Sequence, residues 1–62
     1  MFTVFIDFPD GFNLGLYGGF KSLDTATIHC DYNKTVTQDV HFSVWRGGKC
    51  YYSTDKSVKI EG

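Results

Sequence analysis

A chain of 62 residues is long enough for one small domain and too short to bury a large core. Its apolar fraction of 42% and aromatic fraction of 18% exclude a disordered chain, and its formal net charge of −1 lacks the broad positive field of most nucleic-acid-binding and membrane-surface proteins. The amino terminus has no basic segment, and Asp7 interrupts its apolar run before a secretion signal is complete. We therefore expect a cytoplasmic protein with two reduced cysteines.

Residues 2–17 predict a first antiparallel hairpin. Apolar residues alternate on both sides of Pro9-Asp10-Gly11, which is typical of a tight turn because proline fixes φ and glycine can enter the left-handed region. Phe5 and Tyr17 are predicted to lie on the face opposite the core. The expected core-facing residues are Phe2, Val4, Ile6, Phe8, Phe12, Leu14 and Leu16.

Residues 20–33 have two interpretations. Ser22 is a suitable helix N-cap, and Asp24 lies where the helix dipole favours an acid. Residues 25–32 also alternate as a half-buried strand would, and that alternative would make the protein a small all-β barrel. We favour the helix because it has a start signal. Its expected core-facing positions are Leu23, Ala26, Cys30 and Asn33, with Asn33 closing the helix.

Residues 40–52 predict a second hairpin. Two adjacent glycines, Gly47-Gly48, suit a two-residue type I′ turn, in which both residues have positive φ. The expected pairs across the hairpin are Arg46 with Lys49, Trp45 with Cys50, Val44 with Tyr51, and Ser43 with Tyr52. This register places Val40, Phe42, Val44 and Tyr51 on the core face, and His41, Ser43, Trp45, Cys50 and Tyr52 on the other. Val58 and Ile60 suggest a short edge strand after the hairpin.

The predicted fold is therefore α+β with element order ββαββ. One domain spans residues 1–62, and a four-stranded antiparallel sheet carries one helix packed on one face.

Residues able to bind metal or perform catalysis are present, but their spacing matches no motif. His29, Cys30, His41 and Cys50 are zinc-binding types, yet they form neither a Cys-x2–4-Cys nor a His-x3–5-His pair. Asp39 beside His41, with Cys50, is the one conceivable Cys/His arrangement and has no recognisable catalytic spacing. A Cys30–Cys50 disulfide is disfavoured by the expected compartment. We expect no metal, no cofactor and no enzymatic activity.

Aromatic residues on the face opposite the helix favour a function in binding. We expect a non-enzymatic protein-interaction module, such as a small phage or bacterial regulator or inhibitor of a larger protein, with another protein or a second copy of the chain as partner. The candidate binding residues are Trp45, Tyr17, Tyr52, Phe5, Arg46 and His41.

The alternative is a single-stranded nucleic-acid-binding protein whose bases stack on Tyr17, Trp45 and Tyr52. The net charge argues against nucleic acid, and no stretch of the chain predicts a membrane partner.

Overall fold

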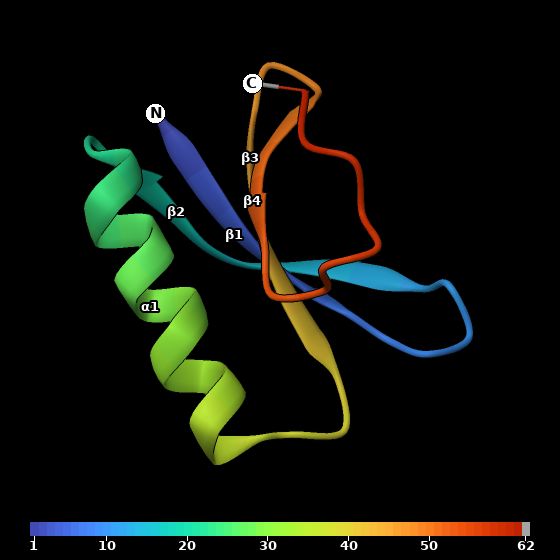
Figure 1. The fold of residues 1–62 in the computed structure, drawn as a ribbon. Coiled ribbons are helices and arrows are strands. Elements are labelled where there is room, and N and C mark those ends of the chain that lie inside the picture. Colours follow the sequence, from blue (N-terminus) through green and yellow to red (C-terminus); the bar gives the residue numbers. More distant parts are fainter. Residues whose placement is uncertain (62) are drawn as a thin grey trace.

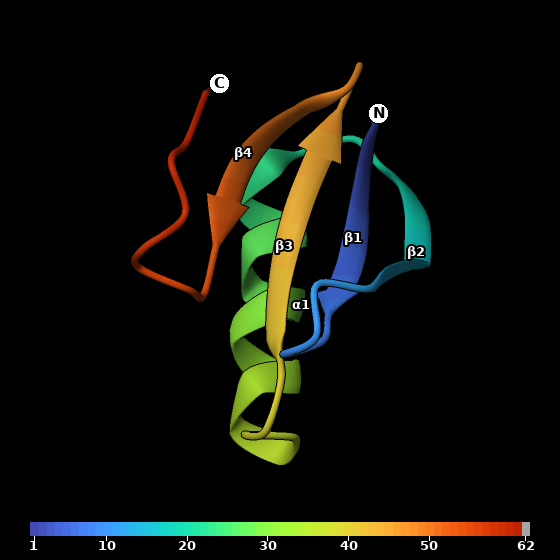
Figure 2. The same ribbon diagram turned by 90° about the vertical axis from the view of Figure 1, so that its right-hand side faces the viewer.

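The computed structural model describes residues 1–61 and confirms the predicted α+β fold (Figure 1). Its elements are β1 (Phe2–Asp7), β2 (Asn13–Phe20), α1 (Leu23–Val36), β3 (His41–Arg46) and β4 (Lys49–Ser53). The four strands form one antiparallel sheet in the spatial order β2-β1-β3-β4. Helix α1 lies across one face of this sheet, as Figure 2 shows, so the helical interpretation of residues 23–33 is correct.

Helix α1 begins as predicted and ends later than predicted. The Ser22 hydroxyl oxygen accepts hydrogen bonds from the backbone N–H groups of Asp24 (3.1 Å) and Thr25 (3.4 Å), which satisfies two donors of the first turn. Asn33 does not close the helix. Its carbonyl instead accepts from the N–H of Thr37, and α1 extends to Val36.

The connection from α1 to β3 is held by one lysine. The Lys34 ammonium donates to the carbonyl oxygens of Gln38 (2.7 Å) and Val40 (2.8 Å), so it satisfies acceptors just beyond the helix end. This places Val40, which is buried, at the entrance to β3.

Both predicted turns are present. In the first hairpin the Gly11 N–H donates to the Phe8 carbonyl (3.0 Å), and φ at Gly11 is 94°. The Asp10 carboxylate accepts from the N–H of Phe12 (3.0 Å), as an Asx turn requires. In the second hairpin φ is 59° at Gly47 and 77° at Gly48, the two positive values of a type I′ turn.

The predicted register of the second hairpin is correct next to the turn and wrong beyond it. Arg46 pairs with Lys49 and Trp45 with Cys50, but Val44 then pairs with Tyr52 rather than Tyr51. A bulge inserts one unpaired residue at this point, and alternation along the sequence does not reveal such an insertion. Tyr52 therefore lies on the helix-facing side, where its hydroxyl donates to the Asp31 carboxylate of α1.

The first hairpin is bulged as well. Phe5 pairs with Gly15 and Ile6 with Leu14, but Val4 pairs with Tyr17, and a second irregularity separates Tyr17 from Phe20. Tyr17 therefore faces α1 rather than the opposite side, and its ring lies 5.9 Å from that of His29. The predicted position of Tyr17 on the helix-free face is wrong for the same reason as that of Tyr52.

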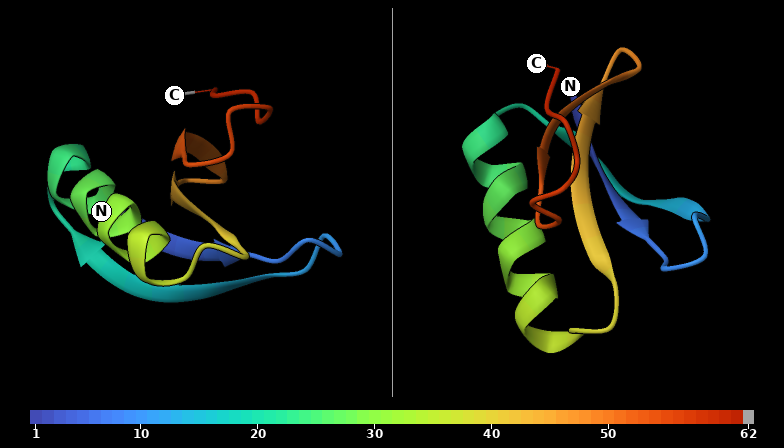
Figure 3. Two further views of the ribbon diagram at one scale, coloured as in Figure 1. Left: turned by 60° about the horizontal axis from the view of Figure 1, so that its bottom comes forward. Right: turned by 45° about the vertical axis from the view of Figure 1, so that its right-hand side comes forward.

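The hydrophobic core lies between α1 and the strands β1 and β3. Its buried members are Phe2, Val4, Ala26, Cys30, Val40, Phe42 and Val44. Phe12, Leu14 and Leu16 were expected in this core but are 60%, 52% and 40% exposed. The reason is visible in Figure 3, where the distal end of the first hairpin extends beyond α1.

The last described residues do not form the predicted strand. Residues 54–61 run as turns and irregular chain beside β4. The Asp55 carboxylate accepts from the N–H (3.0 Å) and hydroxyl (2.7 Å) of Ser57 in one of these turns. The N–H of Glu61 donates to the Cys50 carbonyl of β4 (3.0 Å), so this segment stays close to the sheet.

Candidate functional site

The helix-free face of the sheet carries Trp45, which was the first candidate binding residue. Its ring packs edge-on against Phe5, with centroids 6.2 Å apart. Its indole N–H donates to the Ser43 hydroxyl (2.9 Å), and Ser43 in turn donates to the Asp7 carboxylate (2.7 Å). The one polar group of Trp45 is thus already used inside the protein, and the ring is half-buried.

Phe5 is also partly covered by its own sheet. Its ring lies over Gly15 of β2, where an added Cβ would be 3.7 Å away. A shallow pocket of about 270 Å³ lies beside these aromatic rings and reaches the Gly47-Gly48 turn. Phe5 and Trp45 therefore form a small, self-packed aromatic pair rather than a broad exposed surface.

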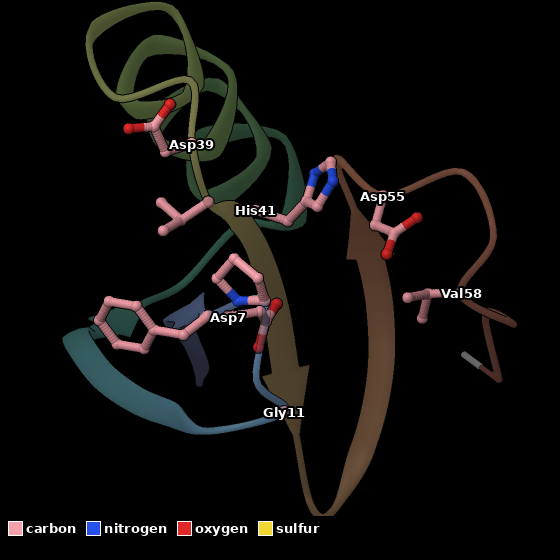
Figure 4. Close-up of a pocket in the computed structure, with 9 residues that line it drawn as sticks. Asp7, Gly11, Asp39, His41, Asp55 and Val58 are labelled. Atoms are coloured by element: carbon pink, nitrogen blue, oxygen red, sulfur yellow. The ribbon is translucent and has the colours of Figure 1, made fainter.

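A larger pocket of about 400 Å³ lies where β1 ends and β3 begins (Figure 4). Its polar lining consists of Asp7, Asp39, His41 and Asp55. The side chains of Asp39 and Asp55 lie on opposite sides of His41 in Figure 4, so these carboxylates do not converge on one point. The His41 ring nitrogen Nδ1 lies 3.0 Å from the Thr54 hydroxyl, and hydrogen bonds from Ser57 lower the pKa of Asp55.

The lining of this pocket contains three carboxylates and one imidazole but neither a cysteine nor a serine. Among residues 1–61, no group of three or more His, Cys, Asp or Glu side chains is placed to hold a metal ion. Its carboxylates are partly engaged in local hydrogen bonds, with Asp7 accepting from Ser43 and Asp55 from Ser57.

The two cysteines are free thiols buried within the protein. Burial, with smaller contributions from Asp31 and Asp7, raises the pKa of Cys30 to about 12. Burial also raises the pKa of Cys50. Because the thiolate is the reactive form, neither side chain is set up as a nucleophile near neutral pH.

The six predicted binding residues do not share one face. Phe5, His41 and Trp45 belong to the helix-free side, whereas Tyr17 and Tyr52 lie on the helix-facing side. Arg46, at the end of β3, places its guanidinium over the rings of Phe2 (4.7 Å) and Tyr51 (5.2 Å). The prediction of a common aromatic face is therefore wrong. Tyr17, Trp45 and Tyr52 also do not form the stacking platform on which the nucleic-acid alternative depended.

A different surface, on the first hairpin and α1, carries large apolar side chains that are 40% to 67% exposed, and sequence reasoning missed it. On the first hairpin, Leu14 faces the helix side because it pairs with Ile6, and Tyr17 does so because it pairs with Val4. Phe12 stacks on Phe8, which itself packs against the core. We call the following set the open apolar surface: Phe12, Leu14, Leu16, Tyr17, Tyr32 and Val36.

Helix α1 contributes the last two members of this set. Tyr32 and Val36 follow His29 at spacings of three and seven residues, so they lie on the same flank of the helix. That flank faces β2, because the His29 ring contacts Tyr17 and lies 4.8 Å from Phe20. Tyr32 and Val36 are each 67% exposed.

The sequence contained two features that belong to this surface. Residues 12–20 include no charged side chain, although β2 is an edge strand and edge strands usually carry charges that discourage association. The exposed helix residues Tyr32 and Val36 are apolar at positions where a solvated helix face would be polar.

Comparison of the chain with protein-family models, curated proteins and solved structures found no match. Within residues 1–61, α1 is too short and too polar to cross a membrane.

Proposed function

We propose that this protein acts by binding other protein chains, as a non-enzymatic interaction module, and that the open apolar surface is its binding site. The observation that carries the proposal is the exposure, between 40% and 67%, of six large apolar side chains on one hairpin and on the flank of α1 that meets this hairpin at the contact of Tyr17 with His29. Exposed patches of this kind on small folded domains are typical of protein-interaction sites.

The rest of the fold supports this assignment. The Phe5–Trp45 pair satisfies its polar group internally, and the larger pocket contains no convergent catalytic groups. The open apolar surface, in contrast, consists of aromatic and aliphatic side chains, which is the composition of an interface core. Tyr17 is the one predicted binding residue that belongs to it.

A displayed library of short random peptides tests the proposal, because it samples many candidate partner sequences at once. The protein is immobilised at low concentration, and we expect it to enrich peptides rich in aromatic and aliphatic residues. Leu16→Lys, which places a charge in the surface, should weaken binding of the selected peptides at least tenfold. Ile60→Lys is the matched control, because Ile60 is 43% exposed against 40% for Leu16 and lies beyond β4 at the opposite side of the sheet.

Two results would refute the proposal. One is selection of no peptide above background. The other is a set of peptides that bind wild type, Leu16→Lys and Ile60→Lys with equal affinity, since this would place binding elsewhere on the molecule.

A further inference from the structure

The charge and the area of the open apolar surface bear on which partner covers it. We infer that it is the interface of a symmetric homodimer, in which two copies pack these side chains against each other across a two-fold axis. This inference rests on the proposed function, because it names the first partner of the same surface.

Charge is the first argument for a second copy as the occupant. A two-fold interface brings each residue close to its own counterpart, so any charge near the axis meets the same charge. All six members of the open apolar surface are uncharged, and Lys34, the basic residue between Tyr32 and Val36 in the sequence, is turned toward the carbonyls of Gln38 and Val40. A copy of the surface is therefore compatible with itself, whereas a charged partner would find nothing to pair with.

Area is the second argument. The three aromatic members, each about half exposed, offer on the order of 100 Å² apiece, since a large aromatic side chain can bury about 150–250 Å². With the smaller Leu14, Leu16 and Val36 and the adjoining backbone of β2, the surface offers on the order of 600 Å², which is the lower end of what one partner contributes to a stable interface of roughly 1,200–2,000 Å² in total. The size of the surface therefore fits a small dimer interface.

The small core supplies a third argument. The largest side chains that are fully buried are only valines, Val4 and Val44, together with smaller residues. A domain of this length rarely gains enough stability from one core and is commonly supported by a disulfide, a metal or a partner chain. Cys30 and Cys50 are free, so a partner chain that covers exposed Phe12, Leu14 and Tyr17 would add the apolar burial that a single copy lacks.

The bulges in β2 determine how the two copies would meet. Continuous strand pairing between two β2 edges requires a regular ladder, but β2 has irregularities on both sides of Tyr17. Such bulges are a recognised means of preventing edge-to-edge association. The interface is therefore one of packed side chains, with α1 of each copy contributing Tyr32 and Val36.

Sedimentation equilibrium of the full chain over a range from about one micromolar to one millimolar tests this inference. We expect wild type to shift from monomer to dimer and to stop at dimer. Leu16→Lys and Val36→Lys should each raise the dimer dissociation constant at least tenfold, because they lie on the two sides of the surface. Ile60→Lys should change it by less than about twofold.

Folding of each variant is checked by circular dichroism, and a second measurement needs no variant. With a soluble nitroxide added to wild type, the methyl signals of Leu14 and Leu16 should be broadened in dilute samples and protected in concentrated ones. A wild type that remains monomeric at millimolar concentration would overturn the dimer. So would equal effects of Leu16→Lys and Ile60→Lys, or Leu14 and Leu16 methyls that stay accessible at all concentrations.

The two proposals fail separately. A monomeric wild type that still selects peptides sensitive to Leu16→Lys would leave the binding function in place and remove only the dimer. A dimer insensitive to Leu16→Lys, together with peptides insensitive to it, would reject the open apolar surface for both roles.

Discussion

The β1–β2 and β3–β4 hairpins have similar sequence patterns and different surroundings. Each has a glycine-containing turn, an alternating apolar pattern and at least one bulge. Phe42 and Val44 of β3 are nonetheless 3% and 0% exposed, whereas every residue of β2 except Phe20 is exposed. The difference is that β3 is central in the sheet and lies under α1. Strand β2 is an edge strand, and α1 approaches it near Phe20, at the C-terminal end of the strand. An alternating pattern thus predicts a strand, but the layers packed on that strand decide whether its apolar side is buried.

The largest effect is expected when one phenylalanine in each hairpin is replaced by alanine. Phe42→Ala should cost about 3–5 kcal/mol of unfolding free energy, because it removes a buried aromatic ring and leaves a cavity. A domain this small is expected to have only ~3–5 kcal/mol in total, so the variant should be largely unfolded at 25 °C. Phe12→Ala should cost about 1 kcal/mol or less, mainly from its stacking on Phe8. Urea unfolding followed by Trp45 fluorescence measures both, at protein concentrations low enough to keep wild type monomeric. Equal losses would show that the first hairpin is as well covered as the second.

A smaller effect is expected where the second hairpin joins α1. Lys34→Met keeps the length of the side chain and removes the ammonium that binds the carbonyls of Gln38 and Val40. A charged donor to two carbonyls at a partly buried site is worth about 1.5 kcal/mol, the lower end of the usual range for charged hydrogen bonds. Amide hydrogen exchange near Val40 should quicken in this variant. Lys21→Met, at an exposed position before α1, is the control and should change neither measurement.

The helix-free face offers the next test. Trp45→Phe preserves an aromatic ring beside Phe5 and removes the N–H that donates to Ser43, so we expect a loss of about 1 kcal/mol. Thermal unfolding and urea titration of wild type and Trp45→Phe under the same conditions measure the change in unfolding free energy. If stability is unchanged while binding of the selected peptides weakens, Trp45 is a contact for a partner rather than part of the internal packing.

The smallest effect concerns a tyrosine in each hairpin at alkaline pH. The hydrogen bond to Asp31, followed by burial, raises the pKa of Tyr52 from an ordinary 10.0 to about 12. Because the folded-state pKa is the higher one, this contribution is fully present below pH 10 and is lost as pH rises toward 12. Tyr52→Phe should lower stability by about 0.5 kcal/mol at pH 7, since solvent screens this exposed pair, and the difference from wild type should vanish by pH 12. Tyr17→Phe in the first hairpin is the comparison, and a pH-independent difference for Tyr52→Phe would contradict the assignment.

Local signals in the sequence determined the elements of this protein. Ser22 and Asp24 marked the start of α1, because the first helical turn has unpaired N–H groups that a hydroxyl oxygen satisfies and a dipole that favours an acid. Pro9-Asp10-Gly11 and Gly47-Gly48 marked the two turns. Proline restricts φ in the first turn, and glycine can adopt the positive φ that both turns require. From these signals the order ββαββ followed directly.

Tertiary structure decided the registers, the faces and the candidate site. A single inserted residue in β4 moved Tyr52 to the side of Asp31, and a similar insertion in β2 moved Tyr17 to the side of His29. No glycine marks the bulge in β4, whereas the irregularities of β2 lie next to Gly15 and at Gly18-Gly19, where φ of Gly19 is 80°. Each bulge reverses which face every later residue occupies. The position of α1 over β1 and β3 then left Phe12, Leu14 and Leu16 uncovered, although their alternation is that of a buried strand. An alternating sequence shows that one side of a strand is apolar. Whether another part of the same molecule covers that side is determined only by the packing of the whole chain.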